Sequence, residues 1–187
     1  MPITFRPAMP TDAVAVAAVH ASSMTEAFAS FLPADFLTSI TGTFPDKYEK
    51  QLATANPSST AVLVVAVDTM NDGSEVIAGI CTVGTTRDNP VAIKGLYVYE
   101  LRCIYVSSAY HGQGLAKKLF QEAARAFGVP VDAKIFCNVF LKNQRAIGFY
   151  KKLGAVEVYR EPNTQYSVEP EVIVTLEWAR MADIFEK

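Results

Sequence analysis

The sequence predicts an α/β fold in which helices cover a mixed β-sheet. Two observations support this: strand-like runs follow one another over 61–106, and strand and helix patterns then alternate toward the C-terminus. That order is typical of a mixed sheet flanked by helices. No repeat, low-complexity tract or Pro/Ser-rich linker divides the 187 residues, so we expect a single domain spanning 1–187.

The N-terminal third is predicted to contain one strand and two helical regions. Residues 3–8 form a short strand, and a polar N-cap at 11–12 precedes a helix over 13–22. A second helical region follows Pro33 and is broken near 42–46, where glycine and proline interrupt the pattern.

The middle of the chain is predicted to form an antiparallel hairpin and a third strand. The hairpin consists of 61–67 and 75–84 around the turn 68–74. After a loop, the run 96–106 forms the third strand, which leads directly into a turn with two glycines.

The C-terminal part is predicted to alternate between helices and strands. Two helices each end at a glycine, 114–127 at Gly128 and 143–153 at Gly154. The strands between and after them cover 133–141, 155–160 and 172–178.

The composition excludes several classes of partner and site. A net charge of −2 and a pI near 5.7 give no basic field for a nucleic acid backbone. The longest apolar run, 61–67, is too short to span a membrane and the N-terminus lacks a signal pattern, so we expect a soluble cytoplasmic protein with no membrane partner. Cys81, Cys103 and Cys137 lie singly in strand-like runs, which predicts buried free thiols and no metal site.

The two glycines that precede the helix 114–127 are Gly112 and Gly114. Glycines at such a turn let the backbone approach an anion, while free N–H groups and the helix dipole supply positive potential. A dinucleotide loop would need Gly or Ala where Lys117 stands, and the Walker pattern is absent. On these residues alone, a tight turn without a ligand stays an alternative to a phosphate site.

The residues around the glycines resemble the coenzyme A loop of the GNAT superfamily of acetyl-CoA-dependent N-acetyltransferases. That loop starts with Gln or Arg, followed by two variable residues, Gly, one variable residue, and Gly or Ala. Here it reads His111, Gly112, Gln113, Gly114, Leu115 and Ala116. The sequence departs from the pattern at its first position, where His replaces Gln or Arg.

A later segment, 143–155, resembles a second element of the same superfamily. The matching positions are Asn143, Ala146, Tyr150 and Gly154, with Ala155 in place of the usual Phe. The opening segment 4–12 is also similar to the family's first strand and helix start, so the resemblance extends over nearly the whole chain.

The resemblance implies a mostly antiparallel sheet whose fourth and fifth strands splay apart around the pantetheine arm of acetyl-CoA, the expected acyl donor. Main-chain groups of Ile104, Tyr105 and Val106 would pair with that arm, and the Ile104 N–H would polarise the thioester carbonyl. The amides of 111–116 would bind the pyrophosphate. Asn143 would hydrogen-bond the pantetheine amides, cap its own helix, or do both.

Direct transfer to an amine requires a base and an acid. By the resemblance, Glu100 is the candidate base, acting through water, and Tyr150 is the candidate acid near the coenzyme A sulfur. In the alternative readings, Glu100 pairs with Arg102 on an unbulged strand, and Tyr150 is a core aromatic residue with its hydroxyl at the surface.

The same resemblance places the acceptor between the first two helices and near the last strands. The candidate residues there are Met24, Phe28 and Phe31, with Leu32, Phe36, Tyr159 and Tyr166 as further contributors. These side chains suit a small or partly hydrophobic amine, but a helix that buries its own phenylalanines would have the same sequence. His20 is expected on the helix surface or partly buried rather than in catalysis.

The predicted function is transfer of an acetyl group from acetyl-CoA to a primary amine of a small molecule or peptide. The alternative is a catalytically inactive GNAT-like module that binds acyl-CoA as a sensor. Glu100 and Tyr150 favour the enzyme, because a sensor needs neither residue. We expect a monomer or a homodimer.

Overall fold

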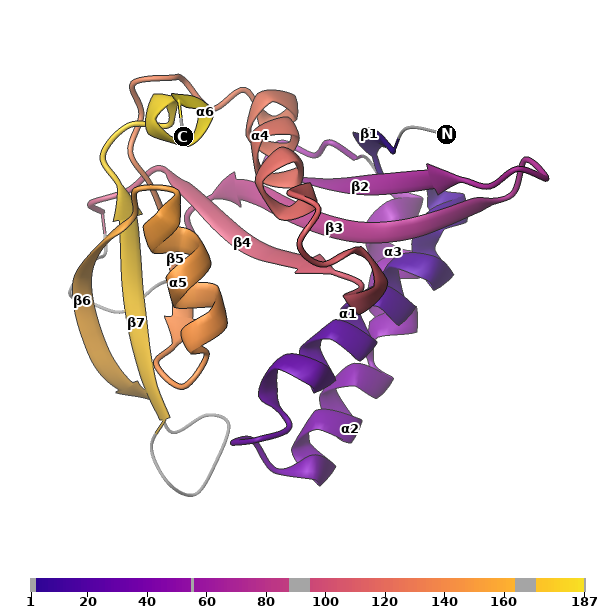
Figure 1. The fold of residues 1–187 in the computed structure, drawn as a ribbon, viewed down its shortest axis with the longest axis horizontal. Coiled ribbons are helices and arrows are strands. Elements are labelled where there is room, and N and C mark those ends of the chain that lie inside the picture. The colour runs from indigo at the N-terminus through magenta and orange to yellow at the C-terminus, as the bar shows by residue number, and fades with distance from the viewer. Residues whose placement is uncertain (1–2, 55, 88–94, 164–170, 187) are drawn as a thin grey trace.

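The expected mixed sheet is present in the computed structural model, which describes residues 3–54, 56–87, 95–163 and 171–186. Seven strands form one sheet in the order β1-β2-β3-β4-β5-β7-β6 (Figure 1). All neighbouring strands are antiparallel except β4 and β5, which are parallel. The strands are β1 (Thr4–Pro7), β2 (Ala61–Thr69), β3 (Glu75–Thr85), β4 (Tyr99–Val106), β5 (Ile135–Phe140), β6 (Val156–Asn163) and β7 (Glu171–Trp178).

Helices cover both faces of this sheet. The buried residues of α1, α2 and α3 form one core cluster with β2 and β3, and those of α4, α5 and α6 form a second cluster on the opposite face. The helices are α1 (Ala13–Phe28), α2 (Ala34–Gly42), α3 (Phe44–Ala53), α4 (Leu115–Phe127), α5 (Gln144–Lys152) and α6 (Ala182–Glu186), and single 3-10 turns are η1 (Pro10–Asp12) and η3 (Ser108–Tyr110).

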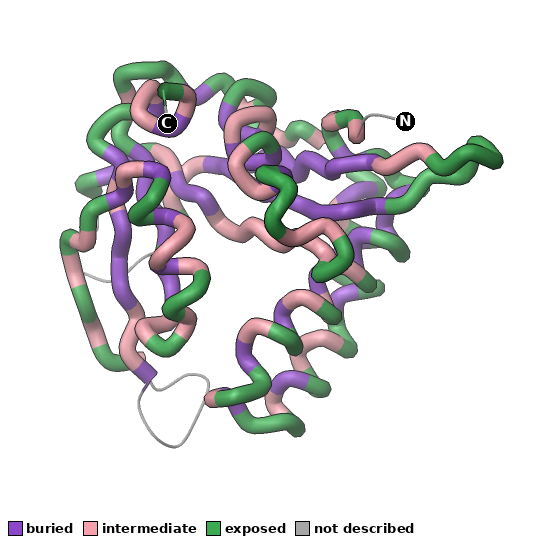
Figure 2. The backbone as a smooth tube through the Cα atoms, viewed as in Figure 1, coloured by how far each residue is buried: buried purple, intermediate pink, exposed green. Residues whose placement is uncertain are grey.

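The β2–β3 hairpin forms as predicted and lies between β1 and β4 in the sheet. Its strands pair over nearly their whole length, from Ala61 opposite Gly84 to Thr69 opposite Glu75. Because helices pack on both faces, residues 61–67 are all buried, which explains why they are apolar without alternation (Figure 2).

Helix ends agree with the glycine pattern, but the length of α1 does not agree with its prediction. Gly128 ends α4 in the left-handed region at φ 78°, and Gly154 follows α5 at φ 93°. The predicted helix 13–22 continues to Phe28, because Met24 and Phe28 extend its buried stripe. The short helix α6 was not predicted.

The parallel strands β4 and β5 pair only at their first residues, Tyr99 with Ile135 and Glu100 with Phe136. Beyond these pairs the two strands diverge (Figure 1). The predicted splay of the fourth and fifth strands is therefore present.

A β-bulge lies in β4 just after this parallel pairing. The register with β3 steps from Leu101 opposite Val83 to Cys103 opposite Thr82, so Arg102 is the extra residue. The strand is therefore bulged, contrary to the alternative in which Glu100 and Arg102 face each other on a regular strand.

In the described part of the chain, no helix combines the length and apolar character needed to cross a membrane.

Candidate active site

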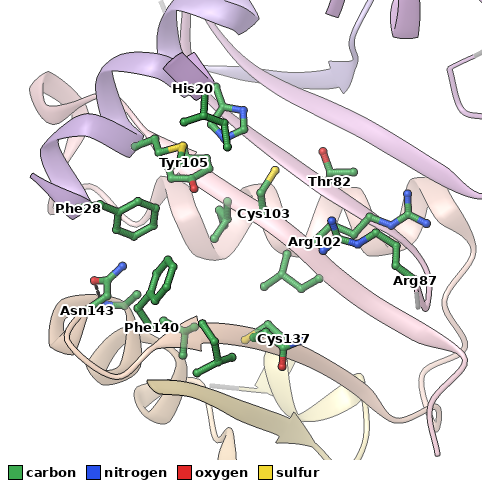
Figure 3. Close-up of a pocket in the computed structure, with 18 of the residues that line it drawn as sticks. His20, Phe28, Thr82, Arg87, Arg102, Cys103, Tyr105, Cys137, Phe140 and Asn143 are labelled. Atoms are coloured by element: carbon green, nitrogen blue, oxygen red, sulfur yellow. Dashed lines mark hydrogen bonds between the residues drawn. The ribbon is translucent and has the colours of Figure 1, made fainter. Parts of the chain in front are cut away.

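A cavity of about 920 Å³ opens where β4 and β5 diverge. Its lining residues come from α1, α2, α3, β3 and β4 on one side of the splay and from β5, β6, β7 and α5 on the other. Figure 3 shows Arg87 and Arg102 together at one end, Phe28 and Phe140 toward the other end, and Cys103 between them on β4.

The main chain of β4 has an open edge toward this cavity. The Ser107 N–H donates to the Ala78 carbonyl oxygen at 2.9 Å, and hydrogen-bonded pairs alternate along antiparallel strands. Tyr105 therefore directs its main-chain groups at β3, whereas Ile104 and Val106 direct theirs away from β3, toward the diverging β5. The Tyr105 side chain packs with the α1–α3 cluster.

The start of α4 presents unpaired N–H groups next to the end of β4. Gly112 and Gly114 adopt φ 76° and 75°, in the left-handed region that favours glycine. The first intrahelical bond runs from the Lys118 N–H to the Gly114 carbonyl at 3.3 Å, so the N–H groups of 114–117 precede it. This geometry suits an anion.

His111, the unusual first residue of this loop, binds the protein itself. Its Nε2 donates to the Val106 carbonyl oxygen at 2.8 Å. The ring therefore joins the glycine loop to the last residue of β4.

Asn143 caps α5, which is one of the two roles expected for it. Its Oδ1 accepts the Ala146 N–H at 3.1 Å. Asn143 also lines the cavity, where its amide nitrogen is left as a donor. Contact of that nitrogen with a cofactor stays a prediction.

Tyr150 belongs to the core cluster and lines the cavity at the same time. It is 8% exposed, and its ring meets Trp178 edge-on with ring centres 5.6 Å apart. Burial raises the pKa of the Tyr150 phenol well above its usual value, and the nearby Cys137 thiol raises it further. The hydroxyl is therefore protonated at neutral pH, as a proton donor must be.

Glu100 is 1% exposed and is held by Arg87 rather than by Arg102. Its carboxylate accepts the Arg87 main-chain N–H at 3.1 Å and Nη2 at 2.5 Å. Arg87 lines the cavity, and Glu100 is not among the described residues that do. The role of Glu100 as a base stays a prediction.

The structure separates the candidate acceptor residues into two groups. Met24, Phe28, Leu32 and Phe36 line the cavity. Phe31 packs instead against Phe28 and Phe140, with ring centres at 5.6 and 5.5 Å. Tyr159 packs near Tyr97 and Phe136, and Tyr166 lies outside the described residues.

His20 is a cavity residue whose environment the sequence analysis did not anticipate. It is buried at 7% exposure, its Nδ1 lies 2.6 Å from the Tyr48 hydroxyl, and its ring stacks on Phe44 at 4.1 Å. Burial, and then the charge of Lys47, lower the pKa of His20 to about 3, so the ring is neutral at pH 7. The spacing of His20, Met24 and Phe28, four residues apart on one helix face, is the pattern that would have located it.

The cysteines agree only in part with the expectation of buried thiols. Cys81 and Cys137 are buried, whereas Cys103 is partly exposed and lines the cavity. All three are free thiols, and the described residues contain no cluster that could hold a metal ion.

Comparison with protein-family models identifies the family of this chain. The model of the acetyltransferase (GNAT) family matches residues 24–155. The chain belongs to the GNAT family of acetyltransferases. That match contains the glycine loop, the splayed strands and α5, and it confirms the resemblance found in the sequence. A search of curated proteins found no match.

Solved structures confirm the GNAT fold over almost the whole chain. The PaiA N-acetyltransferase of Thermoplasma acidophilum in complex with coenzyme A has a TM-score of 0.69 at 16% identity, covering 95% of this chain and 100% of that one. Arabidopsis thaliana NAA60 in complex with a bisubstrate analogue has a TM-score of 0.67 at 20% identity, covering 95% and 97%. YncA of Salmonella typhimurium, a putative acetyltransferase with acetyl-CoA, has a TM-score of 0.63 at 17% identity, covering 97% and 95%.

Proposed function

We propose that this GNAT protein transfers an acetyl group from acetyl-CoA to a primary amine of a small molecule or peptide. The observation that carries the proposal is the cavity at the splay, where the open main chain of β4 and the protonated Tyr150 of α5 lie on opposite walls. Acyl transfer needs both features, because charge develops on the carbonyl oxygen and on the leaving sulfur.

The residues present fit coenzyme A at two places. The N–H groups at the start of α4 suit the pyrophosphate, and the left-handed Gly112 and Gly114 leave open space around their α-carbons. The open edge formed by the main chain of Ile104 and the Val106 N–H suits an extended arm that pairs as an added strand, while the Val106 carbonyl oxygen already accepts from His111. Acetyl-CoA would supply the activated acetyl group.

In the proposed reaction, the acceptor nitrogen forms a bond to the acetyl carbon while the carbon–sulfur bond breaks. The Ile104 N–H would stabilise the oxygen that gains charge, and Tyr150 would give its proton to the departing sulfur. Glu100 would accept the proton that the amine loses, through water. Because Arg87 covers the Glu100 carboxylate, this last role requires the side chain of Arg87, which is 57% exposed, to let water approach.

The sealed carboxylate of Glu100 also favours a second candidate function. A GNAT-fold module that binds acyl-CoA as a sensor needs no accessible base, and the ion pair between Arg87 and Glu100 would then serve only to stabilise the strand ends.

A panel of amines, assayed for release of free coenzyme A beside acetyl-CoA binding by thermal shift, separates the two functions. We expect binding together with acetyl-CoA turnover that depends on an amine. Binding without amine-dependent turnover over a panel of small amines, amino acids and peptides would reject the enzyme and support the sensor.

A further inference from the structure

Arg102, the extra residue of the bulge in β4, is held in place by neutral groups. Its Nη2 donates to the carbonyl oxygens of Thr60 and Thr85, each at 2.8 Å. Its Nε is buried and has no hydrogen-bond partner among the described residues. Carbonyl oxygens orient a guanidinium without cancelling its charge.

A glycine makes room for this arrangement. A Cβ placed on Gly84 would lie 2.9 Å from the Arg102 Cζ and 2.3 Å from the Thr60 carbonyl oxygen. The guanidinium therefore lies directly over Gly84, in space that a side chain would fill.

Among the described residues that line the cavity, positive charge exceeds negative charge. These residues include Lys47, Arg87 and Arg102 but only one carboxylate, that of Glu161, and Glu100 lies behind Arg87. The Lys47 ammonium lies over the rings of Phe44 and Tyr48, and no carboxylate among the described residues is within ion-pair distance of it. Burial lowers the pKa of Arg102, and the charge of Glu100 only partly offsets this effect. The positive charge of the Arg102 guanidinium is therefore incompletely compensated.

The opposite end of the cavity is apolar. Phe28 and Phe140 meet there edge to face, with ring centres 5.2 Å apart (Figure 3). Met24, Leu32 and Phe36 extend this wall. A molecule that fills the cavity therefore meets aromatic and aliphatic side chains at one end and a guanidinium at the other.

We propose that the acceptor is an amine that carries both a carboxylate and an apolar side chain, as an apolar amino acid does, and that Arg102 binds its carboxylate. A guanidinium recognises a carboxylate through directed, charge-assisted hydrogen bonds. The apolar wall would take the side chain. This inference rests on the proposed acetyl transfer and specifies its substrate.

The alternative role of Arg102 is structural, as a tie between the segment before β2 and the end of β3. A structural tie would affect all acceptors equally, whereas a carboxylate site distinguishes acceptors that differ only in that group. The test therefore compares the ratio of kcat/KM for an amino acid to kcat/KM for its amide, rather than the rate with one acceptor.

The probes are phenylalanine and phenylalaninamide, with leucine and leucinamide as a second pair, each assayed for kcat/KM by release of coenzyme A. The variants are Arg102→Met, Arg102→Lys and, as a control, Arg125→Met, whose side chain is exposed on α4 and pairs with Glu122. Intrinsic differences in amine basicity cancel when the acid-to-amide ratio of each variant is divided by that of the wild type.

We expect Arg102→Met to lower the acid-to-amide ratio by about tenfold or more, which is typical of a lost hydrogen bond to a charged group. Arg102→Lys should retain part of the ratio, and Arg125→Met all of it. Thermal unfolding and acetyl-CoA binding verify that each variant is folded. If Arg102→Met does not fold, the test uses the wild type and Arg102→Lys. The proposal then requires that the wild type prefers the acid over the amide and that Arg102→Lys loses part of this preference.

Two results would overturn the inference. The first is turnover by Arg102→Met with an acid-to-amide ratio equal to that of the wild type. The second is a wild-type enzyme that acetylates the amide as efficiently as the acid. Either result would reject Arg102 as the carboxylate site and leave the proposed acetyl transfer intact. Acetyl-CoA binding without turnover of any amine would reject both proposals.

Discussion

At the residue scale, burial sets the protonation of the side chains that face the cavity. His20 shows this most clearly, because desolvation and the nearby Lys47 disfavour its charged form. The ring is instead held by stacking on Phe44 and by a hydrogen bond with Tyr48. Protonation of His20 would place a charge in this packed environment.

Folding stability should therefore fall on acidification between the ordinary His20 pKa of 6.5 and its folded value of about 3. In this window the unfolded chain binds more protons than the folded chain, so the free energy of unfolding rises with pH, by up to about 1.4 kcal/mol per unit for this group. Above pH 6.5 this group adds no further slope.

Urea unfolding of the wild type and His20→Gln at several pH values between 5 and 8 tests this. Glutamine keeps a hydrogen-bonding group for Tyr48 and does not titrate in the window. We expect the variant to lose part of the slope below pH 6.5. Equal slopes in both proteins would contradict the assignment of a buried neutral imidazole.

At the element scale, the junction between β4 and α4 creates the candidate anion site. Gly112 and Gly114 turn the chain, and the His111 ring returns to the Val106 carbonyl to fix the turn. The N–H groups at the start of α4 are thereby held against the open edge of β4.

Gly114→Ala should weaken coenzyme A binding, because alanine disfavours the left-handed backbone that aims these N–H groups. Gly73→Ala is a matched control, since Gly73 has φ 84°, lies in the β2–β3 turn and likewise has open space around it. Each variant should lose about 1–2 kcal/mol of stability. Calorimetric titration with coenzyme A should show a loss of affinity for Gly114→Ala only; equal affinities would remove the loop from the binding site.

Most elements follow from local sequence patterns. The β2–β3 hairpin, α4 and α5 were predicted because their apolar runs and their glycines lie within one short segment. The extension of α1 was missed because its alanine-rich start hides the stripe of His20, Met24 and Phe28. The short α6 has Ile184 as its one buried residue, which is too little to form a recognisable pattern.

At the scale of the whole molecule, the cavity exists because two parts of the sheet meet over a short distance. β4 and β5 share only two residue pairs, and the open edge of β4 then faces α5 across the splay. Ile104 and Tyr150 line the same cavity through this arrangement. The family resemblance predicts that they lie in one site, whereas local sequence patterns do not.

The same long-range packing explains what the sequence missed in the candidate site. Arg102 becomes a cavity residue through the bulge in β4 and its contacts with Thr60 and Thr85. Glu100 acquires Arg87 as its partner from the end of β3. Neither relation has a local spacing that would predict it.

If acetyl transfer takes place in this cavity with Tyr150 as the acid, turnover should depend on the Tyr150 hydroxyl, which Tyr150→Phe removes. Tyr99→Phe is the control, because Tyr99 packs against Phe127 of α4. With an amine found to be a substrate, we expect kcat to fall about 100-fold or more in Tyr150→Phe, with coenzyme A affinity nearly unchanged and Tyr99→Phe fully active. An unchanged kcat in Tyr150→Phe would show that Tyr150 is not the acid.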